Sequence, residues 1–211
     1  VVQGEMSNER FEGRMLHVKK ADIVIIGGGA AGAMAAIHAR RANPALKVVI
    51  LDKSRIETSG GAGRGMDAIN TIPLPPYSDP EDFVEMQTKI TEGILDQEVS
   101  YAYAERCPRL VQELEEITGR AKGDLFPVDE RGNYQLRYVQ AVNKPMMLYM
   151  DGGNLKRSLA KAVRATGAEV YDRTPVLKIF AGDGRVAGVL GFNIRTGEYL
   201  FIAAKAVCLT A

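Results

Sequence analysis

Three successive glycines, Gly27–Gly29, constrain the fold of this chain more than any other feature. They end a short run rich in β-branched residues, Ala21–Ile26, which is typical of a buried parallel strand. The alanine-rich residues 30–42 predict a helix that Asn43-Pro44 ends, because proline clashes with the preceding turn. Another apolar run, Lys47–Leu51, predicts a second strand. Together these segments predict a βαβ unit.

The glycines of this turn form the pattern G-x-G-x-x-G at Gly27, Gly29 and Gly32. In such a motif the first glycine allows a tight turn, the second lets a pyrophosphate approach the backbone, and the third lets helix and strand pack closely. The helix N-terminus adds free N–H groups and the positive end of its dipole. Asp52 follows Gly32 by 20 residues, where an acid holds a ribose hydroxyl. This arrangement predicts dinucleotide binding.

FAD and NAD share this motif, so the choice between them depends on the residues beyond the βαβ unit. A simple NAD-dependent fold would continue with another strand and helix soon after Asp52, whereas this chain has a glycine-rich loop, Ser59–Gly65, with Arg64 among the small residues. Backbone in such a loop can contact a large flat ligand. The later antiparallel strands are also foreign to the simple NAD fold. We therefore expect FAD, with an NAD(P)-binding dehydrogenase domain as the alternative.

Two helices are expected in the middle of the chain. The first begins near Asp79-Pro80, where aspartate can cap and proline suits the first turn. The second begins near Asp96, and we expect Pro108 to break or kink it. Beyond the proline, apolar residues recur at helical spacing until Gly119 ends the pattern.

The remainder combines an irregular stretch, a helix and late strands. Residues 121–150 predict an irregular or short-stranded segment, and residues 154–165 predict a helix. Turn-rich links separate the later runs, which predicts an antiparallel β-meander and then a buried strand. These four runs are Val176–Ala181, Arg185–Asn193, Glu198–Ala203 and Ala206–Leu209. The fold class expected is α/β, Rossmann-like, with a parallel sheet plus the meander.

Charge and cysteine content narrow the function. The formal net charge of +1 gives no long-range field for nucleic acid or an anionic membrane, and no run is long enough to span a bilayer. Cys107 and Cys208 form neither a disulfide framework nor a set of iron–sulfur or other metal ligands, so we expect a reducing, cytoplasmic location. His17 and His38 have no metal-like or base-like partner nearby in sequence.

Four segments resemble the flavoprotein subunits of fumarate reductase and succinate dehydrogenase, a superfamily that includes L-aspartate oxidase and the adenylylsulfate reductase alpha subunit. They are IVIIGGGAAGAMAA, VVILDKS, TSGGAGRGMDAIN and the closing AKAVCLTA. A further stretch, Asp124–Tyr134, resembles the point where those proteins enter a capping domain. Because the family members are several hundred residues long, the chain resembles an N-terminal portion that stops partway through the FAD domain.

The resemblance implies a role for each matching residue. The FAD pyrophosphate would lie at the glycine turn, the adenosine ribose at Asp52, the flavin at the second glycine-rich loop, and the adenine at the backbone of Val176. The closing residues would cover the cofactor. The full set is Gly27, Gly29, Ala30, Ala31, Gly32, Asp52, Lys53, Ser54, Ser59, Gly60, Gly61, Gly63, Arg64, Gly65, Val176, Thr210 and Ala211.

Departures from the family pattern refine this expectation. Members with covalent flavin have a histidine where this chain has Gly60, which predicts non-covalent FAD. Residues 68–70 resemble the adenylylsulfate reductase branch, where an asparagine faces the substrate, whereas Arg64 and Met66-Asp67 do not. Arg64 could lie near flavin N1, where a positive charge stabilises reduced flavin, or form a salt bridge within its loop. No catalytic residue is assigned.

The resemblance implies four segments. They are a lead-in at 1–20, an FAD-binding part at 21–120, the start of an inserted capping domain at 121–150, and the return of the FAD-binding domain at 151–211. It also implies an FAD-dependent oxidoreductase with a small anionic substrate and an iron–sulfur or other electron-transfer subunit as partner. A non-catalytic FAD-binding module of a larger complex is the remaining alternative.

Overall fold

The chain consists of two compact units in the computed structural model, which describes residues 9–11, 13–139 and 143–211. One unit joins the described residues of Val1–Arg64 to Lys156–Ala211, and the other comprises those of Gly65–Leu155. The second unit is therefore inserted into the first. This division differs from the boundary expected at residue 121, because the two central helices pack with residues 121–155 rather than with the large sheet.

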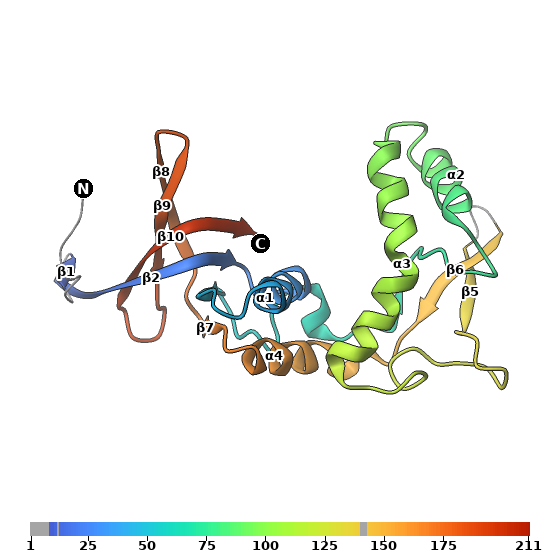
Figure 1. Cartoon of the computed structure of the whole chain (residues 1–211), viewed down its shortest axis with the longest axis horizontal. Helices are drawn as coiled ribbons and strands as arrows, with labels where there is room; N and C mark the ends of the chain where they lie inside the picture. Colours follow the sequence, from blue (N-terminus) through green and yellow to red (C-terminus); the bar gives the residue numbers. More distant parts are fainter. Residues whose placement is uncertain (1–8, 12, 140–142) are drawn as a thin grey trace. The chain divides into compact units, whose positions relative to one another are not determined.

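The first unit is built on a seven-stranded sheet (Figure 1). Neighbouring strands in its parallel half are β7, β3, β2 and β10, and β9 and β8 extend it as an antiparallel meander. β1 pairs antiparallel with β2. This confirms the predicted fold class. The strands are β1 (Glu9–Phe11), β2 (Arg14–Ile26), β3 (Val48–Leu51), β7 (Glu169–Tyr171), β8 (Val176–Gly182), β9 (Arg185–Phe192) and β10 (Tyr199–Leu209).

Two helices belong to this unit. α1 (Ala30–Ala42) has the bounds predicted from sequence and packs on β2 and β3. Ala33 and Ala36 are completely buried, since small side chains let the helix axis approach the sheet. α4 (Leu155–Ala165) buries Leu159 and Val163. The strands contribute an apolar core of their own, in which β-branched residues such as Val24, Val189 and Ile202 dominate.

Two strands are longer than the sequence predicted. β2 begins at Arg14, so residues 14–20 are part of the sheet and not a loose lead-in, because they pair with β10. Residues 1–8 and 12 of that lead-in lie outside the described part. β10 is one strand and not two, since it pairs with β9 over residues 199–203 and with β2 along its length. Lys205, which interrupts the apolar pattern, is accommodated by an ion pair with Asp22 at 2.7 Å.

The second unit contains α2 (Pro80–Ile90), α3 (Gln97–Thr118) and a three-stranded sheet of β4 (Ala68–Ile69), β6 (Lys144–Tyr149) and β5 (Leu136–Val139). Asp79 caps α2 in a capping box with Asp82, and Asp96 caps α3. Gly119 ends α3 in the left-handed conformation, with φ of 67°. One apolar cluster of this unit consists of the buried residues Phe83, Val84, Met86, Ala104 and Met146.

Pro108 neither ends α3 nor divides it, so of the predicted break or kink the break does not occur. Proline removes one helical hydrogen bond and usually kinks or ends a helix. Buried residues nevertheless continue on one face of α3 on both sides of the proline, at Ala104, Cys107, Val111 and Leu114. Burial of this continuous apolar face offsets the cost of the missing bond.

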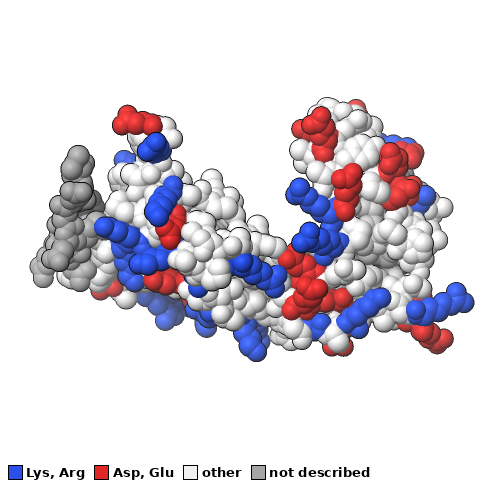
Figure 2. Space-filling model, viewed as in Figure 1, with Lys and Arg blue, Asp and Glu red and all other residues white. Residues whose placement is uncertain are grey.

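Charged side chains of both signs are spread over the visible face of the molecule (Figure 2). This agrees with a sequence of 27 basic and 26 acidic residues. Within the described ranges, every helix is too short or too polar to cross a membrane.

Candidate nucleotide site

The site is built on the turn between β2 and α1. Gly27 has a φ of 101°, in the left-handed region, and donates its N–H to Leu51 O at 2.9 Å. A Cβ on Gly32 would lie 1.9 Å from Gly27 O and 2.8 Å from Thr210 Oγ1. Only glycine at position 32 therefore lets the first turn of α1 lie against the end of β2. Gly32 does not line the adjacent cavity, so its part is to bring the helix N-terminus there.

The N-terminus of α1 is open to a ligand. Gly29 occupies the N-cap position without a side-chain cap, and the first turn contains no acidic residue. Ala30 and Ala31 are exposed. A Cβ on Gly29 would meet only Gly60 Cα, at 3.8 Å. The first N–H groups of a helix lack intrahelical acceptors, so this end offers donors and positive potential to an anion.

Asp52 lies directly after β3 and is 3% exposed. Its Oδ2 accepts a hydrogen bond from the N–H of Gly28 at 2.5 Å, and its Oδ1 accepts from the N–H of Ser54 at 2.6 Å. A Cβ on Gly28 would lie 2.9 Å from that Oδ2, so the residue beside the acid also has to be small. Each carboxylate oxygen retains acceptor capacity, which a ligand hydroxyl could use.

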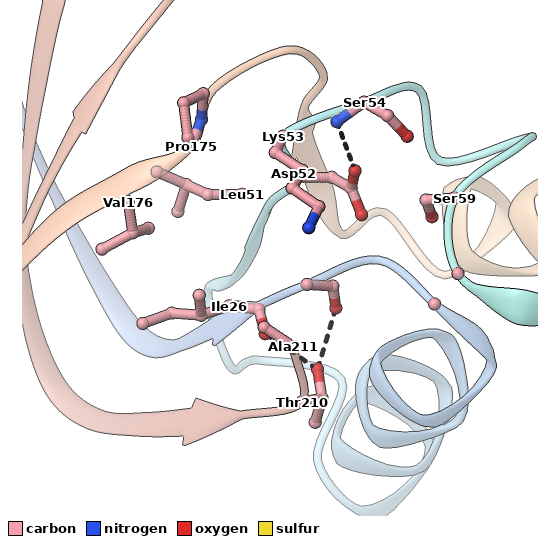
Figure 3. A pocket seen from close by; sticks show the side chains of 13 residues that line it. Ile26, Leu51, Asp52, Lys53, Ser54, Ser59, Pro175, Val176, Thr210 and Ala211 are labelled. Atoms are coloured by element: carbon pink, nitrogen blue, oxygen red, sulfur yellow. Dashed lines mark hydrogen bonds between the residues drawn. The ribbon is translucent and has the colours of Figure 1, made fainter.

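These elements surround a cavity of about 260 Å³ (Figure 3). The close-up shows Asp52 and Ser54 on one side and Thr210 with Ala211 on the other, with Val176 and Pro175 contributed by the start of the meander. The thirteen lining residues are Ile26, Gly27, Gly29, Leu51, Asp52, Lys53, Ser54, Ser59, Gly60, Pro175, Val176, Thr210 and Ala211. Ten of them were predicted from the sequence.

The closing residues are fixed to the glycine turn. Thr210 N donates to Ile26 O at 2.9 Å, and Thr210 Oγ1 lies 3.0 Å from Ile26 O and 2.9 Å from Gly27 O. A Cβ on Gly27 would lie 3.0 Å from Thr210 O and 3.1 Å from Ala211 Cα. Backbone of the glycine turn and of the closing residues Thr210 and Ala211 thus meets at the cavity.

The second glycine-rich loop is divided between the cavity and the surface. Ser59 and Gly60 line the cavity, and Gly60 has a φ of 73°. A Cβ on Gly63 would lie 2.0 Å from Thr58 O, so this glycine serves the tight turn of the 3₁₀ segment Gly61–Arg64. Gly61, Arg64 and Gly65 are exposed and do not line the cavity. Within the described residues Arg64 makes no ion pair, so the alternative of a salt bridge within the loop is not observed.

A buried charged network lies beside the cavity and was not predicted from the sequence. Lys156 on α4 is 3% exposed, and its Nζ donates to Ile56 O. Asp172 Oδ1 accepts a hydrogen bond from Ile56 N at 2.7 Å, so both backbone polar groups of Ile56 are hydrogen bonded. Burial lowers the pKa of Lys156, and the nearby Asp52, Glu57 and Asp172 carboxylates oppose that shift.

Arg164 completes this network at the surface of α4. Its Nη2 lies 2.9 Å from Glu57 Oε1 and 3.3 Å from Asp172 Oδ2. Burial alone would raise the pKa of Glu57, but the hydrogen bond from Arg164, a backbone hydrogen bond and the charges of Arg164 and Arg55 together lower it. The signal for Lys156 was present in the sequence, because a lysine occupies the apolar stripe of α4 at helical spacing from Leu159 and Val163.

The glycine turn, Asp52 and the returning strand are the parts that a dinucleotide fold requires. The sequence model of a family described as an FAD binding domain matches residues 22–211. The chain belongs to this family. FAD is therefore its cofactor, and the NAD alternative is set aside.

Relatives of this FAD binding domain include two curated flavoproteins. The flavoprotein subunit of the 8-methylmenaquinol:fumarate reductase of Wolinella succinogenes is 27% identical over 198 residues, covering 91% of this chain and 31% of the relative. The adenylylsulfate reductase alpha subunit of Megalodesulfovibrio gigas is 26% identical over 211 residues, covering 88% of this chain and 30% of the relative. The resemblance predicted from the motifs is confirmed, and the chain spans about a third of the length of these relatives.

A solved structure of a related reductase has a similar fold. An adenosine-5-phosphosulfate reductase in complex with sulfite superimposes with a TM-score of 0.81 at 25% identity, over 99% of this chain and 33% of that one. The residues of this FAD binding domain fit the nucleotide half of the cofactor. The uncapped α1 N-terminus suits a pyrophosphate, the Asp52 carboxylate suits a ribose, and apolar Ile26, Leu51 and Val176 suit an adenine ring.

Proposed function

We propose that this chain is the nucleotide-holding part of an FAD-dependent oxidoreductase of the fumarate reductase type. The observation that carries the proposal is the position of Asp52, whose buried carboxylate shares one cavity with Gly29, the uncapped N-cap residue of α1. Ligands of open α/β sheets bind outside the carboxyl ends of the parallel strands, where β2, β3 and β10 end in this chain.

Each part of the cavity has a task in holding FAD. The Asp52 carboxylate accepts hydrogen bonds from ribose hydroxyls, while Gly28 and Ser54 keep it oriented. The free N–H groups of Ala30, Ala31 and Gly32 face the pyrophosphate, and Gly29 leaves it room. Val176 contacts the adenine, and Lys53, Thr210 and Ala211 close the edges.

The flavin end is assigned to the second glycine-rich loop. Ser59 and Gly60 begin it at the cavity, and the half-buried Gly63 and the exposed Gly61, Arg64 and Gly65 continue it toward the flavin. Arg64 is the cation proposed to lie near flavin N1. The bound flavin supplies the two-electron redox chemistry, and the protein supplies binding, orientation and electrostatics. The unit of residues 65–155 is proposed as the start of a capping domain.

Attachment of the cofactor is proposed to be non-covalent. Gly60 stands where covalently flavinylated members of the resembled family have histidine, and it has no side chain to react with the flavin. Its φ of 73° and a Cβ position 3.0 Å from Gly29 Cα favour glycine there on steric grounds.

The substrate is proposed to be a small anion, and the electron partner an iron–sulfur or other electron-carrier subunit. Support comes from the relatives, one named for fumarate and one for adenylylsulfate. Both cysteines are free thiols, which fits the proposed cytoplasmic location.

The test begins with an absorbance spectrum of the protein purified with its flavin, followed by acid precipitation. We expect flavin bands and recovery of intact FAD in the supernatant; flavin that stays with the precipitate would contradict non-covalent attachment. The flavin is then reduced anaerobically, and its reoxidation is followed after addition of fumarate or adenylylsulfate.

Controls separate binding from turnover. Asp52→Asn should weaken FAD retention, whereas Asp183→Asn, in the exposed β8–β9 turn, should leave it unchanged. Retained flavin that neither anion reoxidises, in a protein that includes the remaining two thirds of the relatives' length, would argue against the proposed reaction and for a binding module.

A further inference from the structure

A second cavity lies in the sheet-bearing unit, separate from the nucleotide site. Its volume is about 290 Å³, and the two cavities share no lining residue. Three of its six lining residues are arginines. The six are Arg55, Asp172, Arg173, Asn193, Arg195 and Thr196.

Three separate segments bring the arginines together. Arg55 lies in the loop after β3, Arg173 lies between β7 and β8, and Arg195 lies in the β9–β10 turn. Arg173 N donates to Ser54 O at 2.7 Å, and Ile194 N donates to Arg173 O at 3.0 Å. The backbone therefore holds the three segments in register without using the guanidinium groups.

The β9–β10 turn is fixed in addition by a side chain. Asn193 Oδ1 accepts from the N–H of Arg195 at 2.9 Å and from the N–H of Thr196 at 3.1 Å. The position of Arg195 on the rim is thus set by a local turn and not by a salt bridge.

The positive charge of this cavity is only partly compensated. Within the described residues Arg173 and Arg195 form no ion pair, and Arg55 has only a 3.8 Å contact from Nε to Glu57 Oε2. The one acidic lining residue, Asp172, is already engaged with Ile56 N and with Arg164. Three arginines that line one cavity give it an excess of positive charge, and an added anion would be attracted to that charge.

We propose that this cavity binds a small oxyanion of the phosphate class. Guanidinium groups present planar pairs of N–H donors that match phosphate oxygens. All six lining residues are polar or charged, which suits an orthophosphate or a pyrophosphate group better than an adenine or flavin ring. The anion would bridge the loop after β3 and the β9–β10 turn.

The test is calorimetric titration of the protein with sodium pyrophosphate, with and without saturating FAD. Each of Arg173→Gln and Arg195→Gln is expected to weaken pyrophosphate binding by about tenfold or more, since each variant loses a charge-assisted hydrogen bond to the anion. Arg185→Gln, at the exposed start of β9, removes the same charge from the same unit and should leave the affinity unchanged.

The titration with saturating FAD distinguishes binding in this cavity from binding at the N-terminus of α1, which also attracts phosphate. Pyrophosphate that is displaced by FAD and insensitive to Arg195→Gln would be bound at the nucleotide site, and the proposal would be wrong. An equal loss of pyrophosphate affinity in Arg185→Gln and Arg195→Gln would show that only the net charge of the protein matters. This result would also overturn the proposal. Because the arginine variants are tested without FAD as well, failure of FAD binding does not obscure this result.

The source of the phosphate is distinguished in the FAD-saturated protein. If ATP binds more tightly than pyrophosphate and its binding depends on Arg195, the cavity binds the phosphates of a nucleotide. Pyrophosphate or orthophosphate that binds more tightly assigns it to the free anion. Absence of Arg195-dependent binding of all three at millimolar concentration would overturn the proposal.

Discussion

The ammonium group of Lys156 and the carbonyl oxygen of Ile56 are hydrogen bonded across a sequence separation of 100 residues. This bond ties α4, which begins the returning segment, to the loop that carries Asp52 and Ser54. Ile56 is completely buried and packs beside Gly28, so the loop is held both by the side chain and by the carbonyl of this residue.

Replacement of Lys156 by methionine should therefore destabilise the protein. Methionine keeps the apolar stem but leaves Ile56 O without its donor and removes the cation near the Asp52, Glu57 and Asp172 carboxylates. We expect a loss of about 1–3 kcal/mol in the free energy of unfolding, measured by urea denaturation. Lys161→Met, on the exposed part of the same helix, serves as control. Equal stability of Lys156→Met and wild type would show that the bond contributes nothing net.

Alanine at position 32 should disrupt the nucleotide site through sterics alone. Its Cβ would lie 1.9 Å from Gly27 O, so α1 must move away from β2. Overpacking of this kind typically costs about 1–3 kcal/mol, and FAD affinity should fall as the N–H groups shift. Thermal unfolding and flavin fluorescence quenching measure the two effects. Gly182→Ala, at the exposed end of β8, is the matched control, because a Cβ there meets nothing within 4 Å; a similar loss in both variants would contradict the explanation.

The Asp52 carboxylate should contribute to FAD affinity beyond its effect on the fold. In Asp52→Asn one carboxylate oxygen becomes an NH₂ donor. The side chain can then no longer accept hydrogen bonds from both Gly28 N and Ser54 N. We expect about a tenfold weaker affinity for FAD and for ADP, in line with the loss of a hydrogen bond to a charged group. Competition of ADP with FAD provides the measurement. An unchanged ADP affinity would place the adenosine elsewhere.

Thiol reactivity should distinguish the two cysteines. Burial raises the pKa of Cys107 from its ordinary value of 9.0 to about 11, and the side chain is 1% exposed. A chromogenic disulfide reagent at pH 8 should thus modify Cys208, which is half-buried, and reach Cys107 only after denaturation in urea. Two equally fast thiols in the native protein would contradict the buried position of Cys107.

The same shift has a consequence for stability at high pH. A raised folded-state pKa means that the folded protein favours the protonated thiol, so this contribution is complete below pH 9 and is lost as pH rises toward 11. The stability difference between wild type and Cys107→Ala, from urea denaturation at several pH values, should therefore shrink over that interval. A difference that grows with pH would have the wrong sign.

The first βαβ unit could be predicted almost completely because its signals are local. The glycine turn sets where α1 begins, Asn43-Pro44 sets where it ends, and Asp52 follows the strand directly. The turns of the β-meander were equally readable, since glycine and aspartate at 182–184 permit a tight reversal.

Features that depend on distant partners could not be predicted in this way. The polar start of β2 is a strand only because β10 lies beside it, and the three-residue strand β7 exists only by pairing with β3. Pro108 stays within a helix because of burial on both sides of it. In the cavity, Ile26, Leu51 and Pro175 carry no chemical signature, and the backbone alone turns them toward the ligand.

The insertion of one unit into the other has a consequence for biogenesis. The nucleotide cavity needs Asp52 from the first segment and Thr210 from the last, and the bond between Thr210 and Ile26 spans 184 residues. A ribosome therefore releases all of residues 65–155 before the strand that closes the cavity appears. Contacts this distant in sequence form slowly, because loop closure costs entropy before the contact stabilises the chain. We therefore expect cofactor loading at this cavity to come after synthesis of β10, too late to guide the folding of the earlier segments.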